Sequence, residues 1–356
     1  MAKYPLLMTP LRIRNITVPN RIVMPPMVIF QAEDDGMVAP AHLEHYKRRS
    51  GPGLMIVEGT AVSPEGRINR RQLGIYFDRH IEGLARLAQI IHEGGAIAGI
   101  QLHHAGALAF KETMENSQKQ AMGVFFRLGK QQLMISGLRR IRDAFKDAAH
   151  RAVEAGFDIV EIHGAHGYLF SQFLSPLKNW RIDKYGGKIE NRRRLLLDVL
   201  REICSEVEGS ALATCRLGVS DGHKGGLNLS DGLSTALVLQ NEGLEFLDVS
   251  SGSGAPSYIR PAGSPYSARL HLAQIAKSAL SIPVIGGGGV RRPDLAENAL
   301  RDKMADLIYV GKGILADPTW AQKTIEGKPD SISVCRECKV CFYYTDFTKC
   351  PAHKKK

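Results

Sequence analysis

The chain has 356 residues, with 47 Lys and Arg against 36 Asp and Glu, so its formal net charge is +11. Hydrophobic residues make up 44% and charged residues 23%, a globular composition that excludes a disordered chain. No apolar run approaches the length of about 18 residues that spans a bilayer, and residues 1–14 lack the apolar core of a signal peptide. We therefore expect a cytoplasmic protein without membrane contact, whose cysteines are reduced or bind metal.

The excess of positive charge gives little support to nucleic-acid binding. Part of it lies in residues 192–194 and part at the C-terminal end, in residues 354–356. A basic balance affects solubility and nonspecific binding rather than fold. We therefore expect a small-molecule substrate and no nucleic-acid partner, and we assign some of these cations to anionic ligands. The sequence leaves open whether the chain forms a homo-oligomer.

Eight short apolar segments are predicted as strands. Near-continuous apolar runs of this length are typical of strands that are buried on both faces of a sheet. In chain order, the segments are 21–24, 54–58, 97–101, 159–163, 213–219, 246–250, 283–286 and 307–311.

Helical patterns separate these strands. Apolar residues recur at a spacing of three or four within them, which is typical of a helix with one buried face. The segments are 80–93, 136–155, 189–207, 231–242, 268–279, 292–300 and 319–325. Gly94, Gly156 and Gly243 stand where helices are expected to end.

Eight strands that alternate with helices predict a parallel sheet, closed as an α/β (β/α)8 TIM barrel. The alternative is an open, doubly wound sheet, but no strand–GxGxxG–helix unit opens the chain. The glycine run 286–289 instead follows the seventh strand, where barrels commonly bind phosphate. We assign residues 1–330 to the barrel and residues 331–356 to a Cys-rich C-terminal tail.

Polar residues at the ends of the predicted strands are candidates for the active site, because these ends face it in a barrel. The fourth strand ends in His163, followed by His166 and Tyr168 on a Gly-rich loop. The two histidines could bind a metal, with Glu161 or His104 as a third ligand. They could equally donate hydrogen bonds to one oxyanion, with Tyr168 as a general acid.

Several segments resemble the Old Yellow Enzyme family of FMN-dependent ene-reductases. The most specific is HGAHGYLFSQFLSP at 163–176, continued by an N-W-R-I-D-K-Y-G-G…E-N-R pattern at 179–192. Similar segments occur at 20–27 (NRIVMPPM), 53–68, 100–106, 282–290 and 306–315. The resemblance covers about residues 5–326. It implies a TIM barrel with FMN at its C-terminal mouth and NADH or NADPH as co-substrate.

The resemblance also implies which residues contact the flavin. They are Pro25, Pro26, Met27, Val28, Gly59, Gln101, Arg216, Gly288, Gly289, Gly311 and Lys312. Gln101 matches the amide that bonds the pyrimidine edge of the ring, and Arg216 matches the cation near N1. The last four of these residues, Gly288, Gly289, Gly311 and Lys312, match the residues that bind the phosphate.

The implied reaction reduces an α,β-unsaturated carbonyl compound. Hydride passes from NAD(P)H through flavin N5 to the β-carbon of the substrate. His163 and His166 match the donors that hold the carbonyl oxygen, and Tyr168 matches the proton donor. The competing hypotheses are a metal-dependent barrel lyase or hydrolase, and a noncatalytic or specialised flavin-binding relative with a different electron acceptor.

Three positions depart from the family pattern. Val28 replaces a Thr or Cys that donates a hydrogen bond toward flavin O4. Lys312 replaces an Arg, and so offers a phosphate a point charge rather than a planar fork. Phe30 replaces a Tyr that contacts substrate.

The C-terminal tail carries four cysteines at close spacing. They are Cys335, Cys338, Cys341 and Cys350, in the pattern C-x2-C-x2-C-x8-C-P. Clustered thiols of this kind can bind zinc or an iron–sulfur cluster. Reduced structural thiols, or an ordered tail that covers the barrel, are the alternatives. Larger relatives such as 2,4-dienoyl-CoA reductase hold a [4Fe–4S] cluster after the barrel, although with a different spacing.

Overall fold

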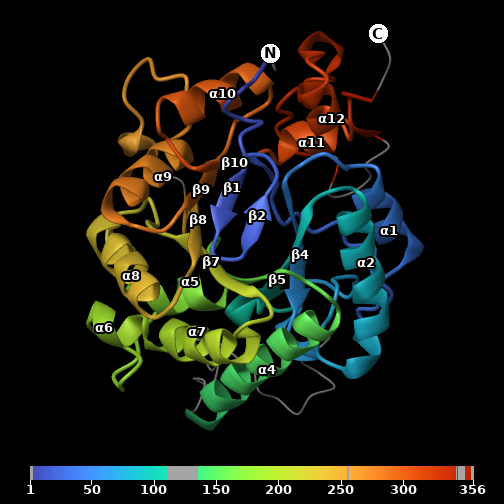
Figure 1. Ribbon diagram of the computed structural model, residues 1–356. Coiled ribbons are helices and arrows are strands. Elements are labelled where there is room, and N and C mark those ends of the chain that lie inside the picture. The colour runs from blue at the N-terminus through green and yellow to red at the C-terminus, as the bar shows by residue number, and fades with distance from the viewer. Residues whose placement is uncertain (1–2, 111–134, 255, 342, 344–348, 354–356) are drawn as a thin grey trace.

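A computed structural model describes residues 3–110, 135–254, 256–341, 343 and 349–353. Eight parallel strands close into a barrel in the order β10-β3-β4-β5-β6-β7-β8-β9, and helices surround it (Figure 1). The strands are β3 Ile22–Met24, β4 Leu54–Ala61, β5 Ile97–His103, β6 Ile159–Gly164, β7 Leu212–Gly218, β8 Phe246–Ser250, β9 Val284–Gly287 and β10 Leu307–Tyr309. The predicted (β/α)8 TIM barrel is confirmed.

The helices lie in the connections from one strand to the next around the outside of the barrel, except for the last two, which follow the final strand. They are α1 Pro40–Lys47, α2 Ile81–Glu93, α4 Ile135–Glu154, α5 Leu169–Leu174, α6 Ile189–Arg192, α7 Arg194–Val207, α8 Leu229–Asn241, α9 Ala268–Ala279, α10 Pro293–Arg301, α11 Lys312–Ala316 and α12 Trp320–Ile325. Short 3-10 turns occur at Pro64–Gly66, Asp78–His80, Gly106–Leu108, Ser257–Ile259 and Pro329–Ser331. No helix among the described residues is long and apolar enough to cross a membrane.

The predicted strands and helices are present, with one interruption. The helix expected over 189–207 is two helices, because the chain breaks between α6 and α7 at Arg193. The short helices α1, α5 and α11 were not predicted from the sequence. Each has eight residues or fewer, which is too short for a helical period to stand out.

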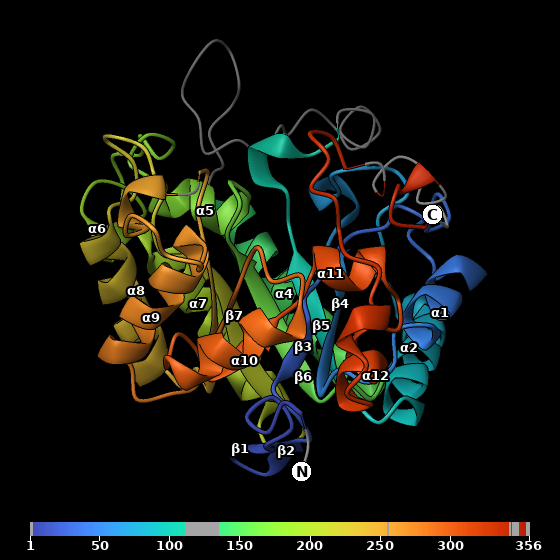
Figure 2. The ribbon, with the colours of Figure 1, turned by 90° about the horizontal axis from the view of Figure 1, so that it is seen from above.

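An antiparallel hairpin closes the N-terminal end of the barrel. It consists of β1 Leu11–Ile13 and β2 Ile16–Val18. Figure 2 shows it at the opposite end of the barrel from the C-terminal residues. Its buried Ile13 and Val18 pack against an apolar cluster inside the barrel. That cluster is formed by Val23, Leu54, Ile56, Ile159, Leu212, Phe246, Ile285, Leu307 and Tyr309.

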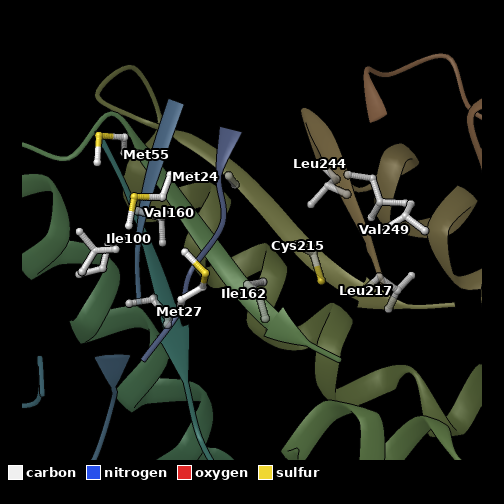
Figure 3. Packing of buried hydrophobic residues seen from close by; sticks show 14 of the residues in the cluster. Met24, Met27, Met55, Ile100, Val160, Ile162, Cys215, Leu217, Leu244 and Val249 are labelled. Carbon is white, nitrogen blue, oxygen red and sulfur yellow. The ribbon is translucent and has the colours of Figure 1, made fainter. Parts of the chain in front are cut away.

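A second, larger apolar cluster lies between the strands and the helices. Its strand residues include Met24, Met55, Ile100, Val160 and Ile162, seen from close by in Figure 3. Successive side chains of a strand point to opposite faces, so Val160 and Ile162 face outward while Ile159 faces the interior. Burial on both faces explains why the strands are apolar over their whole length.

The same alternation aligns the polar residues inside the barrel. Ile159, Glu161 and His163 follow one another at a spacing of two along β6, and Phe246, Asp248 and Ser250 do so along β8. The interior face of each of these two strands is therefore apolar near the hairpin, carries a carboxyl group in the middle and is polar at the C-terminal mouth. The strand register places His163 beside Arg216 of β7.

Candidate active site

A cavity of about 600 Å³ opens at the C-terminal ends of the strands. The structure brings every residue that the sequence assigned to flavin or substrate into its lining. They are Pro25, Pro26, Met27, Val28, Phe30, Gly59, Gln101, His163, His166, Tyr168, Arg216, Gly288, Gly289, Gly311 and Lys312. Four of them lie in the strands β4, β5, β6 and β7, and the others lie in the segments that follow β3, β6, β9 and β10, as is usual for the mouth of a TIM barrel.

Glycines keep part of this cavity open. A Cβ at Gly311 would lie 3.3 Å from Met27 Sδ, and one at Gly59 would lie 3.4 Å from Gln101 Oε1. Gly288 and Gly289 have φ values of +104° and +72°, a conformation that residues with side chains rarely adopt. These positions let a flat ligand approach the backbone, as the expected flavin contacts at these glycines require.

Buried polar and ionisable side chains form a layer inside the barrel, and two of them, Gln101 and Arg216, line the cavity. Gln101 Nε2 donates to Glu161 Oε1 at 2.7 Å, and Arg216 Nε lies 3.2 Å from Asp248 Oδ2. Burial, together with Asp248, raises the pKa of Glu161 to about 8. Burial lowers the pKa of Arg216, but Asp248 and Tyr309 raise it more, so the guanidinium keeps its charge. Its Cζ lies 5.1 Å from the ring centroid of Tyr309.

Three imidazoles and a hydroxyl form a hydrogen-bonded chain at the mouth. His103 Nδ1 lies 2.9 Å from His163 Nδ1, His163 Nε2 lies 3.0 Å from His166 Nδ1, and His166 Nε2 lies 2.7 Å from Ser250 Oγ. Burial lowers the pKa of His103 to about 3 and places those of His163 and His166 well below their ordinary value. All three rings are therefore neutral near pH 7, so each carries one N–H donor.

The ring of Tyr168 packs edge-on against two of these imidazoles. Ring centroids are 4.5 Å apart for His103 and 5.1 Å apart for His163. Burial raises the pKa of Tyr168, so its hydroxyl remains protonated well above neutral pH. A protonated phenol beside neutral imidazole donors suits a reaction in which negative charge develops on a substrate oxygen and a proton is then required.

The structure does not support a metal bound by the two histidines. Their ring nitrogens are hydrogen-bonded to each other, and Glu161 accepts a hydrogen bond from Gln101. His104 accepts the Gly106 N–H at a distance of 3.0 Å, and it does not line the cavity. Within the described ranges, no group of three or more His, Cys, Asp or Glu side chains is placed to hold a metal ion.

Several cavity residues were not assigned to flavin or substrate from the sequence. They are Ile68, His103, Ser250, Arg269, Val290, Arg291, Tyr309, Cys335 and Glu337. His103 and Ser250 lie two residues after Gln101 and Asp248 on the same strand faces, so strand alternation could have identified them. Cys335 and Glu337 come from the tail. An ordered tail that covers the barrel was one alternative from the sequence, but no local pattern indicates that it lines this cavity.

The model of the NADH:flavin oxidoreductase / NADH oxidase family matches residues 6–331. The chain belongs to this family. An NADPH dehydrogenase of Halalkalibacterium halodurans is 38% identical over 316 residues, which are 87% of this chain and 91% of that protein. A NADH oxidase of Thermoanaerobacter brockii is 36% identical over 349 residues, which are 96% of this chain but 54% of that protein. The predicted NAD(P)H-dependent flavin oxidoreductase is thereby confirmed.

Solved structures of flavin oxidoreductases agree with this assignment. An Old Yellow Enzyme homologue from Zymomonas mobilis has a TM-score of 0.77 and 26% identity, over 96% of this chain and 99% of that one. A 2-naphthoyl-CoA reductase in complex with 2-naphthoyl-CoA has a TM-score of 0.86 and 25% identity. That match covers 97% of this chain, which spans only 56% of the reductase.

Proposed function

We propose that the protein is an FMN-dependent ene-reductase, which passes hydride from NADH or NADPH to the β-carbon of an α,β-unsaturated carbonyl compound. The observation that carries this proposal is the grouping of His163, His166 and Tyr168 on one cavity wall. Neutral imidazoles supply N–H donors for an oxygen, and the phenol supplies a proton.

FMN, when bound, supplies the hydride transfer. We assign Gln101 to the polar edge of its ring and Arg216 to the part where reduced flavin gathers negative charge. The buried charge of Arg216 supports this assignment, because a fixed cation stabilises an anion more strongly in a buried site than in water. Gly288, Gly289 and Lys312 suit the phosphate, since backbone N–H groups and a cation neutralise a dianion.

The substrate's carbonyl oxygen is assigned to the histidine pair. Donation by His163 and His166 stabilises the enolate that develops as hydride arrives at the β-carbon. Tyr168 then donates its hydroxyl proton to the α-carbon. The raised pKa of Tyr168 supports this role, because the phenol is in its protonated form at neutral pH.

A two-step titration tests the proposal. NADH or NADPH is added without air to the FMN-loaded protein until the flavin absorbance is bleached, and cyclohexenone is then added. Recovery of the oxidised spectrum with consumption of the enone is expected. If the flavin is bleached by NAD(P)H but is reoxidised only by oxygen or another acceptor, the ene-reductase proposal is wrong.

The second candidate is a flavin oxidoreductase with a different electron acceptor. Val28 favours it, because this cavity residue lacks a hydroxyl where the family usually places a donor toward the flavin. One relative also bears the name NADH oxidase. Oxygen, quinones and ferricyanide as acceptors in the same titration separate the two candidates.

We also propose a metal centre in the tail, at Cys335, Cys338, Cys341 and Cys350. All four thiols are free and half-buried. In the described parts of the chain, they are not brought together as a metal-binding group. The support is therefore their spacing in the sequence, and no step of the reaction is assigned to the metal.

A further inference from the structure

A second cavity, of about 1480 Å³, lies beside the active-site cavity. Phe30 lines both cavities. The segment 334–337 lies between them: Val334 and Arg336 line the second cavity, whereas Cys335 and Glu337 line the active-site cavity. We call this second space the tail cavity, because the C-terminal tail supplies part of its lining.

The partition between the two cavities is held in place from both sides. Arg291 Nη1 lies 3.1 Å from Glu337 Oε2, which ties the tail segment to the loop after β9. Phe30 has a φ of +52°, an uncommon conformation for a bulky residue that persists only where its surroundings impose it. The two cavities therefore share Phe30 as a common lining residue.

The tail cavity contains a buried guanidinium without an acidic partner. Arg49 is only 5% exposed. Its Nη1 donates to the His45 carbonyl oxygen at 2.8 Å and its Nη2 to the Tyr343 hydroxyl at 3.2 Å, whereas Nε has no partner. No carboxylate among the described residues pairs with it. A buried charge without a counter-ion is costly, so this arrangement points to an anion that binds from the cavity.

Two further cations in the lining lack acidic partners. Arg71 donates through Nε to the Ala32 carbonyl oxygen at 3.3 Å, and Arg336 comes from the tail segment. Neither forms an ion pair within the described ranges.

The acidic residues of the lining are already engaged. Asp317 accepts Lys323 Nζ at 2.7 Å, and Asp330 lies 3.2 Å from Arg292 Nη2. Glu44 Oε1 lies 3.8 Å from Arg48 Nε. The positive charge of Arg49, Arg71 and Arg336 is therefore left for a ligand.

We propose that the tail cavity binds the phosphorylated adenosine end of a nucleotide-linked reactant, whose reactive end lies in the active-site cavity. Guanidinium groups match phosphate oxygens in charge and in two-pronged geometry. The volume far exceeds that of a phosphate ion and is above the usual range for a small-molecule site, so it accommodates a nucleotide.

Two kinds of reactant carry this group, namely NAD(P)H and acyl thioesters of coenzyme A. The binding site itself is inferred from the cavity alone. That its occupant takes part in a hydride transfer next door rests on the proposed function.

Nucleotide fragments test the site without any turnover. Binding of 2′,5′-ADP, 3′,5′-ADP and 5′-ADP to the FMN-loaded protein is measured by calorimetry, with inorganic phosphate as the reference. We expect at least one fragment to bind more tightly than phosphate. Arg71→Gln and Arg336→Gln should each weaken that binding about tenfold or more, the usual effect of losing a charged hydrogen bond.

Matched variants control for a general loss of positive charge. Arg70→Gln and Lys339→Gln remove neighbouring cations whose side chains do not line the tail cavity, and they should leave fragment binding unchanged. Arg49→Lys tests the buried position, but it could impair folding, so the conclusion depends on the two exposed arginines. Absence of fragment binding, or equal binding by all variants, overturns the proposal. Phosphate binding as tightly as the nucleotides also overturns it.

Steady-state kinetics then identify the source of the nucleotide. In Arg71→Gln and Arg336→Gln, a raised KM for NADH or NADPH assigns the site to the dinucleotide. A raised KM for an enoyl-CoA, with an unchanged KM for cyclohexenone, assigns it to coenzyme A. No change in any of these values overturns the link to the active site. If the fragments bind but the enone is not reduced, the nucleotide site is supported and the proposed function is rejected. If the enone is reduced but no fragment binds, the proposed function is supported and the nucleotide site is rejected.

Discussion

His163 Nε2 lies 3.0 Å from His166 Nδ1, so the two proposed substrate donors are hydrogen-bonded to each other. For both rings to donate to one oxygen, this contact has to be replaced by contacts with that oxygen. Ser250 at the far side of His166 can hold the ring while this happens, because its hydroxyl lies 2.7 Å from Nε2.

We predict that His163→Ala and His166→Ala weaken the binding of para-substituted phenolates, which mimic an enolate. A loss of about tenfold or more is expected for each, because a charged hydrogen bond is removed, while FMN binding should change little. His166→Asn should lose less, since Asn tolerates the φ of +60° at this position and still donates. The measurement is spectral titration of the flavin.

The exposed His150→Ala serves as the control for these variants. If phenolates bind equally well to His163→Ala and to the unaltered protein, the donor assignment is wrong. If zinc or a chelator changes activity while phenolates fail to bind, the metal hypothesis for this histidine pair replaces it.

Tyr168→Phe should separate the two half-reactions. The phenyl ring can keep the edge-on contact with His103, so the wall of the cavity is preserved. Flavin reduction by NAD(P)H should therefore be nearly unchanged, whereas reoxidation by a weakly activated enone should slow about 10²-fold or more. Stopped-flow absorbance measures both steps. Equal slowing of the two, or no slowing of the second, would refute the assignment.

The strands and their order around the barrel could be predicted because the apolar runs are buried on both faces. Gln101, His163 and Arg216 could be placed at the mouth because they interrupt those runs near the strand ends. The partition at 334–337 could not be predicted. Its residues contact the barrel through side chains far away in the chain, such as Arg291 with Glu337, and no local period marks such contacts.

Val28→Thr should make the flavin easier to reduce. Val28 lines the cavity next to the loop residues Pro26 and Met27 and cannot donate a hydrogen bond. A hydroxyl that donates to the negatively charged reduced flavin is worth about 1.5–3 kcal/mol, or about 30–65 mV for a two-electron couple. A potentiometric titration should show a rise of this size. Val28→Ala, which adds no donor, is the control, and an equal rise there would contradict the explanation.

Glu58 should make stability depend on pH. Its Oε1 accepts the Ile29 N–H at 3.2 Å, its other oxygen is buried without a partner, and burial raises its pKa to about 8. The folded state therefore binds this proton more tightly than the unfolded state. The contribution to stability is complete below the ordinary pKa of 4.5 and is lost as pH rises through about 8.

Thermal unfolding across this pH range tests the effect. Glu58→Gln cannot ionise, so the Tm of the unaltered protein should fall by a few degrees relative to this variant between acidic and alkaline pH. The exposed Glu190→Gln should show no such trend. A constant difference in Tm at all pH values would mean that Glu58 does not ionise within this range.

The four tail cysteines are predicted to bind one metal per chain. Thiolates are the ligands that zinc and iron–sulfur clusters select, and the two x2 intervals put three of them within seven residues. Zinc in a structural site would fill all four positions with thiolates. Metal analysis of anaerobically purified protein should therefore give about one zinc per chain, or several irons with a visible absorbance for a cluster.

Cys350→Ser should lower this metal content and destabilise the tail, whereas Cys204→Ser in α7 should not. Cys350 is the better test than Cys335, because Cys335 also lines the active-site cavity and its loss could act there directly. Protein that carries no metal, with four titratable thiols in its native tail, would show that these cysteines are not a metal site.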